Sequence, residues 1–138
     1  MARIMGIDYG TKKTGIAVTD SLQIICSGLD TIPTLTLYDF IKAYLETEEV
    51  EKIVVGMPLH EDGNPAQIAH LVVGFIRKLR KLYPAIEVVE WDERGSSKAA
   101  KEVILLSGTK KSKRRDKSLV DKIAAALILQ DYMEQNHW

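Results

Sequence analysis

The sequence predicts an α/β domain in which one mixed sheet of five strands is flanked by helices. Two observations lead to this fold class. Three short segments rich in β-branched residues follow each other closely, which favours an antiparallel meander. Two strand–helix units come next, and parallel strands joined in this way carry helices on their faces. A chain of 138 residues suffices for one such domain, and we expect residues 1–138 to form it.

The first half of the chain predicts three strands and one helix. Residues 3–8, 14–20 and 23–28 read as the strands of the meander. An amphipathic helix follows and runs into the acidic stretch 46–51, because apolar residues recur at helical spacing at Leu37, Phe40, Ile41, Tyr44 and Leu45.

The second half predicts two further strands and three helices. Residues 52–57 form a near-continuous apolar run, which is typical of a strand covered on both faces. Asn64 can cap the next helix. The apolar stripe of that helix is predicted at Ile68, Leu71, Val72, Phe75, Ile76, Leu79 and Leu82. The remaining elements are a strand at 86–91 and helices at about 96–106 and 118–134.

Composition excludes several classes of protein. The 19 Lys and Arg residues balance 19 Asp and Glu residues, so net charge points to no particular partner. Cys26 is the single cysteine, which excludes an internal disulfide and favours a reducing, cytoplasmic location. We expect it to be a small core residue of a strand rather than a nucleophile. No apolar run reaches the roughly 20 residues of a membrane span, so we expect no membrane partner.

Acidic residues fall where an α/β sheet places its sites. Such sites form at the carboxyl ends of parallel strands; the first predicted strand ends at Asp8, and the fifth ends before Asp92 and Glu93. Asp121 lies near the start of the last helix on its apolar stripe, where a carboxylate is costly unless it is paired or binds a metal. Carboxylates suit Mg²⁺ or Mn²⁺. The alternatives are structural: a turn former, strand-end charges and a first-turn helix acid.

Basic residues gather in one segment. Residues 110–117 hold six of the nineteen Lys and Arg residues, and Lys12 and Lys13 follow Asp8 closely. A charge run is often a solvated loop; next to Asp121 it is also suited to contact phosphates. It contains no aromatic residue, which favours contacts to the nucleic-acid backbone over base readout. The candidate nucleic-acid ligands in this segment are Lys110, Lys111, Lys113, Arg114 and Arg115.

Four blocks, in order along the chain, match one family. They are 6–12 (Gly-Ile-Asp-Tyr-Gly-Thr-Lys) with 15–20, 55–59 with 62–63, 92–94 (Asp-Glu-Arg), and 120–130. In these blocks the chain resembles the YqgF family, the Holliday junction resolvase-like proteins regarded as pre-16S ribosomal RNA nucleases. The resemblance implies an RNase H-like fold. It also implies a cytoplasmic, metal-dependent nuclease whose partner is structured RNA, and possibly the pre-ribosomal particle.

The resemblance also implies roles for individual residues. Asp8, Glu93 and Asp121 correspond to the acidic triad of the family and are expected both to hold the metals and to be catalytic. Asp92 is an alternative to Glu93, since neighbouring strand residues point to opposite faces. Arg94 is a candidate phosphate ligand. The expected mechanism has Asp8 bridging two ions, with Glu93 and Asp121 each completing one coordination sphere.

Three alternatives stay open at this point. A resolvase acting on branched DNA would use the same chemistry and should be a stable dimer, because a Holliday junction has two-fold symmetry; monomer and homodimer both remain possible from the sequence. A non-catalytic RNA-binding factor in ribosome assembly is a second alternative. The Asp-x-Gly-Thr pattern at 8–11 also resembles the phosphate loop of actin-like ATPases, but those folds need two lobes, and this chain supplies one.

Overall fold

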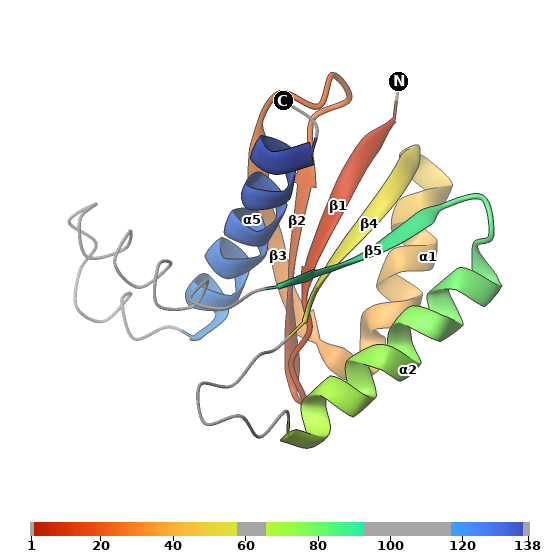
Figure 1. Ribbon diagram of the computed structural model, residues 1–138, viewed down its shortest axis with the longest axis vertical. Helices are drawn as coiled ribbons and strands as arrows, with labels where there is room; N and C mark the ends of the chain where they lie inside the picture. The colour runs from red at the N-terminus through yellow and green to blue at the C-terminus, as the bar shows by residue number, and fades with distance from the viewer. Residues whose placement is uncertain (1, 58–65, 93–116, 137–138) are drawn as a thin grey trace.

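Five strands form one mixed sheet. The computed structural model describes residues 2–57, 66–92 and 117–136. The strands are β1 (Arg3–Asp8), β2 (Lys13–Thr19), β3 (Cys26–Pro33), β4 (Val50–Met57) and β5 (Glu87–Asp92). Their order across the sheet is β3-β2-β1-β4-β5, which makes β1 central (Figure 1). β1, β2 and β3 pair antiparallel, whereas β4 pairs parallel with β1 and with β5. The predicted mixed sheet is confirmed.

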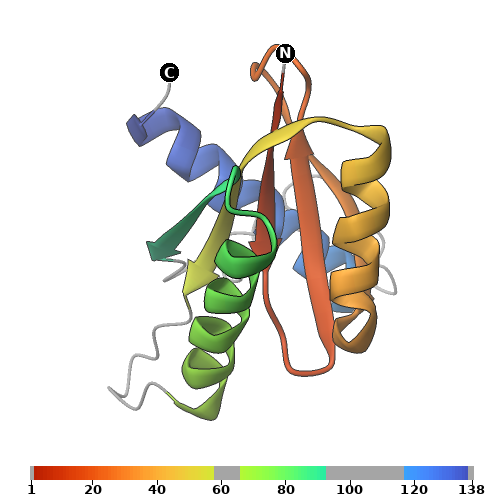
Figure 2. The ribbon, with the colours of Figure 1, turned by 90° about the vertical axis from the view of Figure 1, so that its right-hand side faces the viewer.

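Helices cover both faces of this sheet. α1 (Leu37–Thr47), preceded by the short turn η1 (Thr34–Thr36), lies on the same face as α2 (Ala66–Leu82). α5 (Lys117–Asn136) lies on the opposite face, as Figures 1 and 2 show. The helix predicted at 96–106 and the proposed cap Asn64 lie outside the described residues. None of the described helices is long and apolar enough to cross a membrane.

The core is divided by the alternation of the strands. On β1, Met5 and Ile7 pack in the cluster that α1 and α2 cover, whereas Ile4 packs in the cluster under α5. Successive strand residues point to opposite faces, and burial on both faces explains why β1 and β4 are nearly continuous apolar runs. The sheet therefore separates two apolar layers, and charged residues are left to its edges.

The third strand differs from the prediction. It runs over Cys26–Pro33, not 23–28. The side chain of Asp20 accepts hydrogen bonds from the backbone N–H groups of Ile24 (2.7 Å) and Ile25 (2.8 Å), and Gln23 adopts a φ of 59°. These local contacts close a loop over residues that otherwise favour a strand. The result leaves the side chains of Ile24 and Ile25 60% and 62% exposed.

Two smaller differences concern the helices. α1 ends at Thr47, and β4 begins at Val50, so the acidic stretch 46–51 does not continue the helix. In α2, Val72, Phe75, Ile76 and Leu79 are buried as expected, but Leu71 and Leu82 are about half exposed. The predicted stripe was wider than the surface that the sheet and α1 offer for contact.

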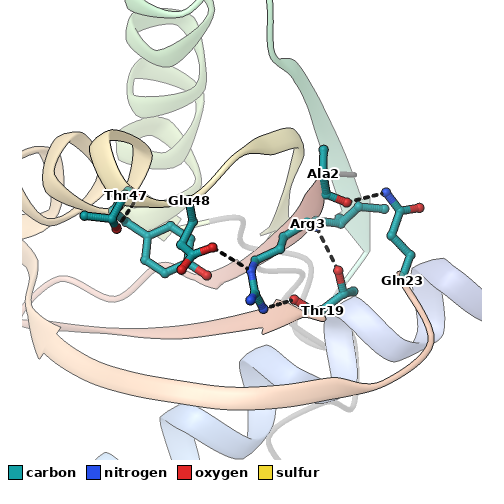
Figure 3. A network of polar contacts seen from close by, with 8 residues as sticks. Ala2, Arg3, Thr19, Gln23, Thr47 and Glu48 are labelled. Carbon is teal, nitrogen blue, oxygen red and sulfur yellow. Dashed lines mark hydrogen bonds and ion pairs between the residues drawn. The ribbon is translucent and has the colours of Figure 1, made fainter. Parts of the chain in front are cut away.

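A polar network fixes the amino end of β1 (Figure 3). The Arg3 guanidinium donates to the Glu48 carboxylate (Nε–Oε2, 3.2 Å) and to the Thr19 carbonyl (3.0 Å). The Thr19 hydroxyl accepts from the N–H of Ile4 at 2.9 Å, and Gln23 donates to the Ala2 carbonyl at 2.8 Å. These contacts tie β1 to the end of β2 and to the link between α1 and β4.

Candidate active site

The carboxyl ends of three parallel strands share one edge of the sheet. Asp8 ends β1 and Asp92 ends β5, with β4 between them. The registers Ile7↔Val55 and Gly56↔Trp91 place the ends of the three strands at nearly the same level. Two strand spacings separate β1 from β5 by about 10 Å. Acidic side chains from β1 and β5 therefore have to converge across the end of β4 to share a ligand.

Asp8 belongs to the α5 face of the sheet. It is half-buried, its backbone is paired with Gly15 of β2, and it continues the alternation that places Ile4 and Gly6 toward α5. The antiparallel ladder with β2 holds the backbone of β1 up to Asp8, the last residue of the strand. Asp8 therefore lies at the end of the central strand, on the edge of the sheet where parallel α/β sheets form their sites.

Gly6 sets the position of α5 over β1. A Cβ atom on Gly6 would lie 2.9 Å from Cβ of Leu129 and 3.0 Å from the carbonyl oxygen of Ala125, so the helix backbone lies directly on the strand. At the other end, Tyr132 accepts a hydrogen bond from Lys52, which pairs with Ile4. α5 therefore runs opposite to β1, as Figure 1 shows.

This direction brings the start of α5 to the carboxyl edge of the sheet. Ala125 is level with Gly6, and position 121 lies one helical turn before it, toward the end of β1 that carries Asp8. Ala125 and Ile128 are buried where α5 packs against the sheet. The backbone of α5 thus brings position 121 toward Asp8.

The basic residues next to Asp8 are exposed. Lys12 lies in the turn after β1 and Lys13 begins β2, and both residues are exposed. The other predicted ligands, Glu93, Arg94 and the basic residues Lys110, Lys111, Lys113, Arg114 and Arg115, lie outside the described residues. Within the ranges 2–57, 66–92 and 117–136, no group of three or more His, Cys, Asp or Glu residues could hold a metal ion.

Cys26 does not behave as a nucleophile. It is partly buried at the start of β3 and packs against the cluster under α5. Burial, followed by the charges of Asp20 and Glu134, raises the pKa of the thiol to about 11. A reactive cysteine needs the opposite shift, so the structure agrees with the expected packing role.

Sequence reasoning missed the residues that position the site. Gly6 has a sequence signal, because a glycine inside a strand often marks a close approach of another backbone. Gly10 is a second case, since a Cβ atom there would lie 2.1 Å from the carbonyl oxygen of Lys13. Thr14 and Thr34 hold the turn between β1 and β2, and no pattern in the sequence indicates that they meet.

The family model described as "RuvX: Holliday junction resolvase" matches residues 2–135, nearly the full chain. This chain belongs to the RuvX family. The match confirms the family resemblance of the four sequence blocks, and it spans both the sheet and α5.

Curated relatives of the same length support this membership of the RuvX family. A protein of Flavobacterium johnsoniae is 46% identical over 138 residues, covering 100% of both chains. A protein of Phocaeicola vulgatus is 47% identical over 138 residues, covering 100% of this chain and 99% of its own. Both carry the name "Putative pre-16S rRNA nuclease".

A solved structure shares the fold. It is titled "T. thermophilus RuvC in complex with Holliday junction substrate" and superposes with a TM-score of 0.60, covering 99% of this chain and 97% of its own, at 18% sequence identity. The RNase H-like fold expected from the sequence is thereby confirmed.

Proposed function

We propose that this RuvX-family protein is a nuclease that hydrolyses phosphodiester bonds in precursor 16S ribosomal RNA with the help of Mg²⁺ or Mn²⁺. One observation carries the proposal: in a chain that matches the family almost from end to end, Asp8 ends the central strand on the face covered by α5. The names of the full-length relatives support the reaction and the substrate. We take residues 1–138 as one nuclease domain.

The chemistry of the donor set fits a hard divalent cation. Asp8 supplies carboxylate oxygens at the sheet edge, and the direction of α5 brings position 121 toward it; Mg²⁺ and Mn²⁺ prefer oxygen ligands. We assign Asp8, Glu93 and Asp121 as the residues that hold the metal. When bound, the cation would activate the attacking water and stabilise the leaving oxygen.

Glu93 is preferred over Asp92 for geometric reasons. On β5, Val89 and Trp91 pack in the cluster under α5, whereas Val88 packs in the opposite cluster. The period of two assigns the odd positions of β5 to the face of Asp8, and Glu93, one position past the end of the strand, would continue this alternation. The distance of about two strand spacings to β1 also favours the longer side chain of a glutamate.

The basic residues are assigned to the nucleic-acid backbone. Lys12 and Lys13 are exposed beside Asp8, and their charges offset phosphates that approach the carboxylates. Arg94 and the basic residues of 110–115 are proposed to extend this contact. We propose a cytoplasmic location and the pre-ribosomal particle as the physiological context, with either a monomer or a homodimer as the working unit.

The test is cleavage of an end-labelled RNA that spans the 5′ side of precursor 16S RNA. Wild type, Asp8→Asn and Glu87→Gln are compared with Mg²⁺, Mn²⁺ or EDTA. Glu87 is an exposed carboxylate at the amino end of β5 and serves as the matched control. We expect Asp8→Asn to slow cleavage by about a thousandfold or more, because metal clamping contributes several kcal/mol, while Glu87→Gln cleaves like wild type.

Two results would contradict the proposal. Equal rates for Asp8→Asn and wild type in a single-turnover reaction would remove Asp8 from the mechanism. RNA binding without cleavage by wild type, in the presence of either metal, would favour a non-catalytic assembly factor.

Branched DNA is the second candidate substrate. The family description names a Holliday junction resolvase, and the structural neighbour was solved with a junction. A junction has two-fold symmetry, so its resolution calls for a dimer with paired sites. Cleavage of a synthetic four-way junction, measured together with the mass of the protein in solution, separates the two substrates: a dimer that cuts the junction faster than the RNA favours DNA.

A further inference from the structure

The turn between β1 and β2 carries two lysines and is contacted by the side chains of two threonines. It begins directly after Asp8 and exposes Thr11, Lys12 and Lys13. At Gly10 the backbone runs so close to the carbonyl of Lys13 that a side chain is excluded. No side chain at position 10 can anchor the turn, so contacts from neighbouring elements to its backbone have to fix it.

Three hydrogen bonds form a closed ring on Gly10. The Thr34 hydroxyl donates to the Gly10 carbonyl at 2.7 Å. Since this contact uses the single hydroxyl hydrogen of Thr34, the 2.9 Å contact between the hydroxyls of Thr14 and Thr34 has Thr14 as the donor. The Thr14 oxygen in turn accepts from the N–H of Gly10 at 3.5 Å. Both backbone groups of Gly10 are thus engaged by two threonines.

Thr34 makes a second contact with the same turn. Its backbone N–H donates to the carbonyl of Lys12 at 2.8 Å. Thr34 begins η1, directly after the end of β3, where Pro33 is paired with Lys13. A single residue between β3 and α1 therefore holds the backbone on both sides of Thr11.

The buried hydroxyl of Thr14 couples two of these contacts through Thr34. Thr14 is fully buried in β2, and a buried hydroxyl without a partner is costly. Removal of the Thr34 hydroxyl takes away the acceptor of Thr14 and the donor to Gly10 at once. The turn then loses the side-chain contact from Thr34, whereas Asp8 keeps its backbone pairing with Gly15.

We propose that Thr34 is a positioning residue that fixes Lys12 and Lys13 for contact with the nucleic-acid backbone. The inference rests on the proposed function and deepens it: Thr34 acts on binding of the substrate and not on the chemical step. An ordered turn presents its two lysines without a further loss of conformational entropy on binding. The backbone of Asp8 is held separately, by its pairing with Gly15 in the β1–β2 ladder.

The experiment compares Thr34→Val with wild type, Thr34→Ser and Thr36→Val. Thr36 lies with Thr34 in η1. Its hydroxyl also donates to a backbone carbonyl, that of Pro33, at 2.7 Å. Thr36→Val is therefore the matched control. The probe is the precursor 16S RNA fragment described above. Its affinity is measured by fluorescence anisotropy at several salt concentrations, and its cleavage as separate KM and kcat values. Hydrogen exchange of the amides of residues 10–13 reports on the turn itself.

We expect Thr34→Val to weaken RNA binding by about three- to tenfold and to raise KM equally, because both hydrogen bonds of the Thr34 hydroxyl are lost. The value of kcat should remain within about twofold, since uniform binding leaves the chemical step unchanged. Thr34→Ser should restore affinity, and Thr36→Val should match wild type. Amide exchange in the turn should accelerate in Thr34→Val alone. Thr34→Ala provides the same loss of the hydroxyl if the valine variant does not fold.

Other outcomes overturn the inference. An unchanged affinity in Thr34→Val and Thr34→Ala removes Thr34 from substrate binding, and a lower kcat with unchanged KM assigns it to the chemical step instead. RNA binding without cleavage by wild type contradicts the nuclease but leaves the affinity comparison decisive for Thr34. Absence of RNA binding by wild type overturns both proposals.

Discussion

The two ends of β1 are held in different ways. At the amino end, charged side chains serve the fold: Arg3 pairs with Glu48 and also donates to a carbonyl of β2. At the carboxyl end, uncharged groups hold the backbone, namely the hydroxyls of Thr14 and Thr34 around Gly10. The two lysines beside Asp8 are exposed.

The two ends of β1 therefore have different roles: the amino end contributes to stability, and the carboxyl end is proposed to contribute to function. Substitutions at the amino end should change the free energy of unfolding, because its charges are used in folding. Substitutions of charged residues at the carboxyl end should change binding or catalysis with little effect on stability.

The thiol of Cys26, at the start of β3, should be unreactive. Cys26 pairs with Thr19 in the β2–β3 ladder, and burial raises the pKa of its thiol well above its ordinary range, to about 11. At about pH 8 the folded protein should therefore be alkylated by iodoacetamide about a hundredfold more slowly than the urea-unfolded chain, since the thiolate is the reactive form. Equal rates would show that the thiol is accessible and ionises normally.

The same shift predicts a pH dependence of stability. The pKa is raised in the folded state, so the unfolded chain loses its thiol proton first as pH increases. Stability is therefore unaffected below about pH 9 and decreases toward pH 11. A Cys26→Ala variant should lack this part of the decrease in thermal unfolding experiments.

Arg3→Met should destabilise the fold without affecting cleavage. The variant loses two hydrogen bonds but keeps the apolar stem, and a loss of about 1–2 kcal/mol is expected for a partly exposed, charge-assisted pair. Urea unfolding measures the change. Arg77→Met, on the exposed side of α2, is the control and should lie within about 0.5 kcal/mol of wild type. A loss of cleavage in Arg3→Met at full stability would break the division.

Lys12→Gln should weaken nucleic-acid binding slightly and uniformly. Loss of one phosphate contact should reduce affinity about two- to fivefold and reduce the slope of log K against log salt by about 0.7–0.9. Lys81→Gln, in the last turn of α2, is the matched control away from this edge. An unchanged salt slope for Lys12→Gln would mean that the lysine does not contact phosphate.

Much of the fold could be predicted from the pattern of apolar residues in the sequence. Apolar alternation and helical spacing predicted all five strands and located α1, α2 and α5. The third strand was displaced because one side chain, Asp20, caps a loop through Ile24 and Ile25, and such a local contact outweighs strand propensity.

Some residues of the candidate site could be predicted from the sequence, and others could not. Asp8 was predictable because it ends an apolar strand in an α/β pattern. Gly6 could have been recognised from its place inside a strand. The contact of Thr34 with Thr14 could not be predicted, because it depends on the register of β2 with β3, which the sequence does not specify. Glu93 and the basic residues of 110–115 remain predictions.

The most direct test measures activity and stability together in Asp8→Asn and Arg3→Met. Single-turnover cleavage of the precursor 16S RNA fragment with Mg²⁺ is recorded beside thermal unfolding of each variant. We expect Asp8→Asn to unfold at the wild-type temperature and to cleave about a thousandfold more slowly, whereas Arg3→Met unfolds at a lower temperature and cleaves at the wild-type rate. Wild-type cleavage by Asp8→Asn would contradict the assignment of the carboxyl end of β1 as the active site.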